Sequence, residues 1–231
     1  MAVVAKALRG STNVESTQRG LTKGESTKRG TRPDKRRAIL DAAAPIFGNE
    51  GYERASVDAI ASAAGVSKPT IYSYFGGKEQ LFRESVADSA VEQNAEAFAV
   101  IQRLDLSRNR WRASLFELGL KLVDCQRSDC ARFLQRMIAA ESVRDPEVYH
   151  AVRTRAAEPI LEALAGRLAM LGNAGYLSVP DPALAARQFL ALINAQIPEL
   201  TEQGTKKVPD AAIRRAVDAG VNTFLRASAN L

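Results

Sequence analysis

Apolar residues recur every three or four positions along most of this chain, which is the spacing of one face of an α-helix. From residue 34 onward the pattern predicts a series of helices, and no run alternates convincingly enough to indicate a strand. The fold class is therefore predicted to be all-α. We expect helices over about residues 34–51, 56–64, 68–75, 78–103, 110–126, 129–142, 146–171 with a break at Pro159, 182–196 and 210–227.

Residues 56–75 carry the start and stop signals of two short helices joined by a tight turn. Ser56 and Ser67 are good N-caps, and Gly65 can supply a positive φ between them. Pro69 fits the first turn of the second helix because that turn needs no amide donor. This pattern predicts a helix-turn-helix. In the helix before it, Pro45 is expected to cause a kink, since it removes a backbone hydrogen bond.

The second helix of this motif has two different faces. Ile71 and Phe75 share the inner one, and Lys68 lies at the start of the helix, where backbone amides are exposed. Backbone amides and hydroxyl groups can hydrogen-bond to DNA phosphates, while longer side chains can contact base edges in a major groove. Taken alone, Gly65 fits a plain three-helix packing unit equally well. The outer face carries Pro69, Thr70, Tyr72 and Ser73.

Charge is distributed unevenly along the 231 residues, whose net charge is +6. Residues 1–37 hold ten basic and three acidic side chains, and the remainder is nearly neutral. Residues 1–33 are polar and contain a near-repeat, so we expect a disordered basic arm that favours a polyanion partner. By analogy with homeodomain arms, Arg29, Arg32 and nearby residues would reach the minor groove, and Arg36 is a further candidate for DNA contact. The alternative is a solvated linker that touches DNA diffusely.

Several classes of protein are excluded by composition. The longest uncharged stretch, residues 168–180, is too short for a membrane span, and Lys6 interrupts the apolar start of any secretory signal. Cys125 and Cys130 make no disulfide framework, which favours a cytoplasmic location. We interpret them as buried structural thiols, with redox sensing as the alternative. With His150 as the single histidine, we expect no catalytic residue, metal or cofactor.

The run SVDAIASAAGVSKPTIYSYFGGKEQLF, residues 56–82, resembles the DNA-binding signature of the TetR family of bacterial transcriptional regulators. Residues 145–193 resemble the AefR-like subgroup more loosely. The resemblance implies an N-terminal three-helix DNA-binding domain over residues 34–82, following the arm of residues 1–33. A long helix would join it to a C-terminal helical domain for ligand binding and dimerisation, residues 83–231.

The resemblance also implies a role for individual residues of the motif. Those expected to face the major groove are Lys68, Pro69, Thr70 and Tyr72. Those expected to hold phosphates are Ser56, Ser67, Tyr74 and Lys78. Ser73 is a further candidate for DNA contact, although Ser73 and Tyr74 could each simply be solvated.

The C-terminal domain is expected to bind a small hydrophobic effector and to pair with a second copy. Large side chains on the middle helices are candidate effector contacts, although each could equally be ordinary core: Trp111, Phe116, Phe133, Met137 and Tyr149. In the family the last two helices form a four-helix bundle between subunits. The expected dimer contacts are Phe189, Leu192, Ile193, Val217, Val221 and Phe224.

The leading hypothesis is a ligand-responsive one-component transcriptional regulator, most often a repressor. It would bind a palindromic operator in double-stranded DNA as a homodimer and leave it when a small molecule binds. The alternative is an architectural protein that binds DNA through its basic arm, without sequence preference. An enzyme that retains a vestigial DNA-binding domain would need a group of catalytic residues, and we find none in the sequence.

Overall fold

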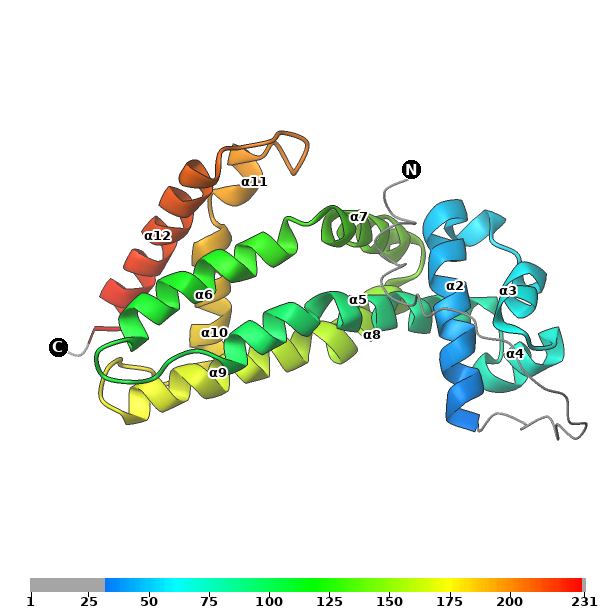
Figure 1. Ribbon diagram of the computed structural model, residues 1–231, viewed down its shortest axis with the longest axis horizontal. Coiled ribbons are helices and arrows are strands. Elements are labelled where there is room, and N and C mark those ends of the chain that lie inside the picture. The colour runs from blue at the N-terminus through cyan, green and yellow to red at the C-terminus, as the bar shows by residue number, and fades with distance from the viewer. Residues whose placement is uncertain (1–31, 230–231) are drawn as a thin grey trace, which may run out of the picture. The chain divides into compact units, whose positions relative to one another are not determined.

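The structure, a computed structural model, describes residues 32–229, and these contain helices and connecting segments but no strand (Figure 1). No helix in this part of the chain combines the length and the apolar character needed to cross a membrane. The elements are α2 (Arg32–Arg54), α3 (Val57–Ala64), α4 (Lys68–Phe75), α5 (Lys78–Gln102), α6 (Trp111–Gln126), α7 (Asp129–Arg144), α8 (Pro146–Val152), the π-helical turn η1 (Arg153–Ala157), α9 (Glu158–Asn173), α10 (Pro182–Asn194), α11 (Ile197–Leu200) and α12 (Asp210–Ala227). The all-α prediction is confirmed.

The helix boundaries follow the expected signals to within a few residues, and α11 was not anticipated. The chain divides into two compact units, one ending at Ser85 and the other beginning at Val86. Most of the arm expected over residues 1–33, with its candidate contact Arg29, lies outside the residues described, and its last two residues begin α2. The side chain of Arg32 also lies outside the description.

The first unit packs α2, α3, α4 and the start of α5 around a small aromatic and aliphatic core. Phe47 of α2 meets Phe82 of α5 edge to face, with ring centroids 5.0 Å apart. Ile60 and Ile71 are fully buried and bring α3 and α4 to the same core. Aromatic pairs in this geometry add to the free energy gained by burying their area.

Helix α2 is interrupted at Gly51, where φ is 76° and ψ is 169°. Residue 51 is the one position in α2 with non-helical angles, six residues after Pro45. The break therefore lies at the glycine, which adopts positive φ without strain, whereas the kink was expected at the proline. The last turn of α2 beyond Gly51 brings Tyr52 against Phe82, with centroids 5.2 Å apart.

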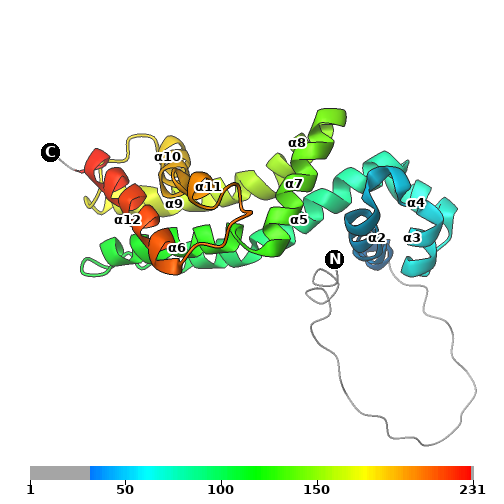
Figure 2. The same cartoon turned by 90° about the horizontal axis from the view of Figure 1, so that it is seen from above.

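The second unit is built around α10, which packs against α6, α9 and α12 (Figure 1, Figure 2). Phe189 of α10 and Phe224 of α12 meet edge to face at 5.2 Å. The two helices approach closely where Gly220 faces Leu192: a Cβ at Gly220 would lie 2.2 Å from the Leu192 carbonyl oxygen. Glycine is required here by space, since any side chain would push the helices apart.

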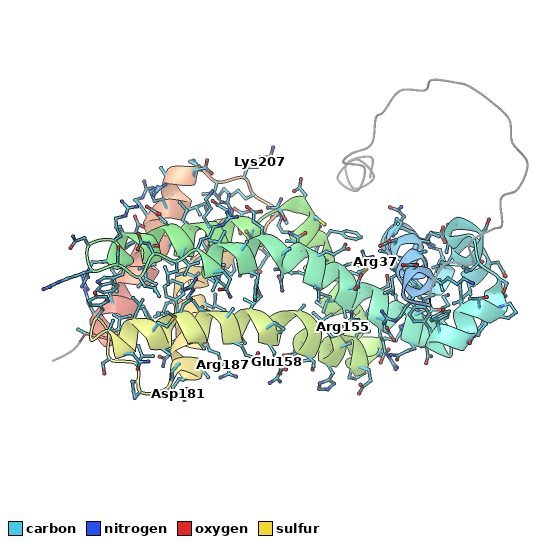
Figure 3. The ribbon with its side chains drawn as sticks, turned by 60° about the horizontal axis from the view of Figure 1, so that its bottom comes forward. Arg37, Arg155, Glu158, Asp181, Arg187 and Lys207 are labelled. Carbon is cyan, nitrogen blue, oxygen red and sulfur yellow. The ribbon has the colours of Figure 1, made fainter. Side chains whose placement is uncertain are left out.

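A π-helical turn separates α8 from α9. Pro159 has no amide hydrogen to donate to the preceding turn, and the widened turn lies directly before it. The break expected at Pro159 therefore takes the form of η1. Ion pairs hold this turn: Arg155 with Asp88 at 3.3 Å and Arg153 with Glu158 at 3.1 Å (Figure 3 labels Arg155 and Glu158).

Candidate nucleic-acid interface

The turn between α3 and α4 has the geometry that the sequence predicted. Ser56 caps α3 by accepting a hydrogen bond from the Asp58 amide at 3.2 Å. Gly65 ends the helix with φ 65° and ψ 32°, and the Val66 amide donates to the Ala61 carbonyl at 3.0 Å. Nothing lies within 4 Å of a Cβ built at Gly65, so glycine is required by its backbone angles and not by space.

The start of α4 is organised by hydroxyl groups. Ser67 is the N-cap, and its Oγ accepts from the Thr70 amide at 3.3 Å. The same oxygen lies 2.8 Å from Oγ1 of Thr70. Pro69 occupies the first turn, as expected. Ser56 and Ser67 thus both cap helices, and their contact with phosphate stays a prediction.

The structure separates the two faces of α4 clearly. Ile71 and Phe75 are buried, with 0% and 4% of their surface exposed. Tyr72 is 43% exposed. Thr70 and Tyr74 are half-buried. The candidates with exposed side chains on this helix are Lys68, Pro69, Tyr72 and Ser73.

Lys68 is already engaged within the unit. Its Nζ donates to Oδ2 of Asp58, in the first turn of α3, at 2.9 Å. This hydrogen bond, and next the negative charge of Asp58, raises the pKa of Lys68. The ammonium group is therefore held at the outer face of the motif, beside the exposed amides of α4.

Two further candidates have structural partners. The Lys78 ammonium donates to the Glu53 carbonyl at 3.1 Å and lies 4.7 Å from the centroid of the Tyr52 ring. The Arg36 guanidinium lies 5.5 Å from the centroid of the Phe75 ring and is ion-paired with Glu84. Arg36 therefore stabilises the packing of α2 on α4 and α5, and its contact with DNA stays a prediction.

In the second unit, residues of α5 to α10 and of the turn η1 surround a cavity of about 180 Å³, which we call the apolar cavity. The side chains that line it are small, aliphatic or uncharged polar ones. They are Ala90, Gln93, Asn94, Ala97, Leu122, Cys125, Gln126, Ala131, Leu134, Gln135, Ile138, Val152, Ala156, Ala157, Ile160 and Leu190.

None of the five side chains expected to contact the effector lines this cavity, and their contact with an effector stays a prediction. Trp111 is buried and stacks on Tyr176, with centroids 5.5 Å apart and the rings 1° from parallel. Tyr149 is 50% exposed. The remaining candidates, Phe116, Phe133 and Met137, are half-buried outside the cavity lining.

The sequence did contain a signal for the apolar cavity. Ala90, Gln93, Asn94 and Ala97 share one face of α5, at helical spacing, and none of them is large. A buried helical face made of small and amide side chains leaves space that its neighbours must fill. Our expectation had rested on large apolar residues, which do not line the cavity.

The expected dimer contacts also need correction. Five of the six have at most 1% of their surface exposed within a single chain, because they fill the core between α10, α12 and α6: Phe189, Ile193, Val217, Val221 and Phe224. A side chain without exposed surface cannot contact a second copy. Leu192 is half-buried. The amphipathic pattern of the two helices was recognised correctly, but its apolar stripe faces the chain's own core.

The two thiols have different environments. Cys125 is half-buried and lines the apolar cavity, while Cys130 is exposed, contrary to the expectation that both are buried. Burial raises the pKa of Cys125, and the negative charges of Glu96 and Asp124 raise it further. Cys125 is thus held in its protonated, less nucleophilic form.

Comparison with known proteins identifies both parts of the chain. The family model for bacterial regulatory proteins of the tetR family matches residues 39–85. The model for the AefR-like transcriptional repressor, C-terminal domain, matches residues 113–229, which is half of the chain.

Curated relatives match over limited lengths. The HTH-type transcriptional activator FasR of Mycolicibacterium smegmatis is 43% identical over 51 residues, 22% of this chain and 23% of FasR. The repressor AcnR of Corynebacterium glutamicum is 32% identical over 127 residues, 52% of this chain and 65% of AcnR. The chain therefore aligns with less than two thirds of either relative.

Solved structures match over nearly the whole fold. A putative TetR-family transcriptional regulator from Mesorhizobium loti is 30% identical with a TM-score of 0.74, covering 87% of this chain and 100% of that one. The Flavonoid-responsive Regulator FrrA is 29% identical with a TM-score of 0.70, covering 85% and 98%. With its helix-turn-helix and its AefR-like C-terminal helices, this chain belongs to the TetR family of bacterial transcriptional regulators.

Proposed function

We propose that this chain is a ligand-responsive repressor that binds a palindromic operator as a homodimer and leaves it when a small effector binds. In this proposal residues 34–82 read DNA, and residues 83–231 bind the effector and dimerise. The observation that carries the proposal is α4, an independently capped helix whose outer face exposes Lys68 and Tyr72 while its inner face is buried. The matching C-terminal family is described as a repressor domain, which supports repression over activation.

Recognition of DNA would begin at the start of α4. The first amides of the helix and the Lys68 ammonium provide positive potential for a phosphate. Tyr72 lies one turn further along, with an apolar ring for a thymine methyl group and a hydroxyl for a base edge. The caps at Ser56 and Ser67 fix the direction of both helices, so these groups are presented in one orientation.

A second copy would pair through the outer faces of α10 and α12. Residues 184, 188, 191 and 195 are exposed and follow a four-three-four spacing along α10 and just beyond its end. Leu184 is 48% exposed, and the two alanines in the stripe permit close approach of another helix. A two-fold dimer would present two copies of α4 to successive turns of DNA, which requires a palindromic site.

The effector would occupy the apolar cavity. Helix α5 lines that cavity with Ala90 and Ala97, and the same continuous helix begins at Lys78 in the DNA-binding unit. A ligand that prefers one arrangement of these helices would shift the population of dimers away from the DNA-binding form. FrrA, which is named as flavonoid-responsive, supports response to a small molecule in a protein of this fold.

Selection of binding sites from a random double-stranded DNA library, followed by footprinting, tests the proposal. We expect one protected palindrome, and we expect Tyr72→Ala to lose preference for it while Val143→Ala, at a residue 88% exposed in the second unit, behaves as the wild type. Uniform protection of any DNA would instead indicate an architectural protein. Light scattering should show a dimer that Leu184→Glu dissociates; a monomeric wild type would contradict the dimer.

A further inference from the structure

The second unit contains another cavity next to the apolar one. It has a volume of about 160 Å³ and is formed where α6, α7, α10 and α11 meet the loop that follows α11. Among the described residues that line it, the charged ones are two arginines and none is acidic. We call it the polar cavity. Its lining is Gln126, Arg127, Arg132, Gln135, Asn194, Ile197, Pro198, Thr201, Gln203 and Gly204.

The two cavities share a rim. Gln126 and Gln135 line both of them, and both side chains are exposed. Each cavity alone is smaller than the roughly 300 Å³ at which small-molecule sites begin, and the two together reach that size. A ligand that spans the shared rim would meet an apolar lining on one side and a cationic lining on the other.

The apolar part offers little to a charged group. Its described lining contains no charged side chain. Two of its amides already donate within the protein: Gln93 to the Ser128 hydroxyl at 3.3 Å, and Asn94 to the Ala156 carbonyl at 2.9 Å. An aliphatic or aromatic group fits this lining, because burying a charge without a partner costs several kcal/mol or more.

The polar part offers cationic donors. Arg127 pairs with Asp124 through Nη1 at 3.3 Å, and Arg132 pairs with Asp129. Arg127 retains a donor without a partner, because its Nε is buried and makes no hydrogen bond. A buried donor left unpaired is unfavourable, and an anionic acceptor is the group that such a donor binds most strongly.

The position of Arg132 is restricted by the loop beyond α11. A Cβ at Gly204 would lie 2.7 Å from Cδ of Arg132, so the loop backbone packs directly on this side chain. Glu202, Gln203 and Gly204 all have positive φ, which turns the loop tightly across the cavity. Arg132 is therefore confined in the polar cavity, whose lining also contains Arg127 and the shared residues Gln126 and Gln135.

We propose that the effector is an amphipathic carboxylate, whose apolar body occupies the apolar cavity while its carboxylate pairs with Arg127 and Arg132 in the polar cavity. This inference rests on the proposed function, since it names the class of effector that the regulator would bind. It extends that function by assigning the polar cavity, with its two arginines, to the ligand.

Binding of decanoate and of 1-decanol to the full-length protein, measured by calorimetry, tests the inference. The two probes share an apolar chain and differ in charge. We expect decanoate to bind at least about tenfold more tightly than the alcohol, as a charge-assisted hydrogen bond implies. Arg127→Met and Arg132→Met should each remove that difference and leave the affinity for 1-decanol unchanged.

Two variants act as controls. Arg136→Met removes the same charge from α7 at an exposed position that lines neither cavity, and should bind both probes as the wild type does. Ile138→Trp fills the apolar cavity and should weaken both probes about equally. Circular dichroism establishes that each variant is folded, and having two arginine variants keeps the test decisive if one of them unfolds.

Other outcomes would overturn the inference. Equal affinity for the two probes, or arginine variants that behave like Arg136→Met, would show that no anionic group binds in the polar cavity. Failure of decanoate to bind the wild type would reject an amphipathic carboxylate. In each of these cases the protein could still bind a palindromic operator as a dimer. The inference about the effector class can therefore be rejected while the proposed regulatory function stands.

Discussion

The ammonium of Lys68 lies 2.9 Å from the carboxylate of Asp58, which joins the first residue of α4 to the first turn of α3. Both side chains are exposed. A phosphate that approaches the start of α4 would compete with Asp58 for the same ammonium group. The pair therefore keeps Lys68 in position in the free protein and opposes its transfer to DNA.

Replacing Asp58 should strengthen binding to DNA. We expect Asp58→Asn to raise the affinity for any duplex severalfold, because it removes the competing carboxylate, and Lys68→Gln to lower it. Each phosphate contact contributes about 0.9 to the slope of log affinity against log salt, so Lys68→Gln should reduce that slope by about this amount. Fluorescence anisotropy with a labelled duplex measures both. Asp41→Asn is the control, because it removes a carboxylate paired with Arg37 on α2. If Asp41→Asn raised the DNA affinity as much as Asp58→Asn does, the gain would come from net charge and not from the release of Lys68.

Two glycine substitutions should have opposite effects on stability. Gly220→Ala would place its Cβ 2.2 Å from the Leu192 carbonyl oxygen, so α10 and α12 must separate, at a cost of about 1–3 kcal/mol in the free energy of unfolding. Gly166→Ala in α9 meets nothing within 4 Å and should stabilise by about 0.5–1 kcal/mol. Urea denaturation followed by tryptophan fluorescence compares the two. Similar midpoints would disprove the close approach.

Trp111 should act in stability and not in effector binding. Trp111→Ala removes a buried side chain that stacks on Tyr176, and should cost about 3–5 kcal/mol in the free energy of unfolding. Trp111→Phe keeps a ring against Tyr176 and should cost less. Circular dichroism during denaturation measures both. An unchanged midpoint in Trp111→Ala would contradict a structural role.

The reactivity of Cys125 should depend on pH in a predictable direction. Burial and the charges of Glu96 and Asp124 raise its pKa, so little thiolate exists at neutral pH. A Cys130→Ser variant leaves Cys125 as the remaining thiol. Iodoacetamide should alkylate Cys125 in this variant more slowly than it alkylates the thiol of glutathione. The rate should keep rising above the pH at which glutathione reaches its plateau.

The raised pKa of Cys125 also affects folding stability. As pH rises, the unfolded chain loses the thiol proton first, so this group's contribution to stability is present below the unfolded pKa and is lost as pH passes through the folded pKa. Cys125→Ser should therefore flatten the decline of stability in the alkaline range. A decline that is identical in the two proteins would contradict the assignment.

Removal of residues 1–30 should weaken DNA binding and flatten its salt dependence. Residues 1–30 hold six basic and two acidic side chains, so their removal takes away a net charge of +4 that can contact phosphates. Anisotropy measurements at several salt concentrations compare the truncated and full-length chains on one duplex. An unchanged slope would exclude the arm from the interface.

Local structure was predictable because it depends on residues close together in the chain. The caps at Ser56 and Ser67 and the positive φ of Gly65 satisfy backbone groups within a few positions, so the helix-turn-helix could be derived from the sequence. The limits of most helices were predictable for the same reason. The end of the first helix near residue 51 was predicted, and Gly51 ends the regular part of α2. The break expected at Pro45 was not found there, because the non-helical backbone angles in α2 lie at Gly51.

What the sequence left open depends on contacts between distant segments. The amphipathic stripes of α10 and α12 were visible, but only packing against α6 shows that Phe189 and Phe224 fill the chain's own core. In the same way, the cavities arise where small and amide side chains of several helices converge, which no single helix reveals. By itself the sequence determined the fold class, the family resemblance and the reading helix. Tertiary structure decided which apolar faces are buried, where the cavities lie and that Arg127 retains an unpaired donor, because each depends on which helices meet in space.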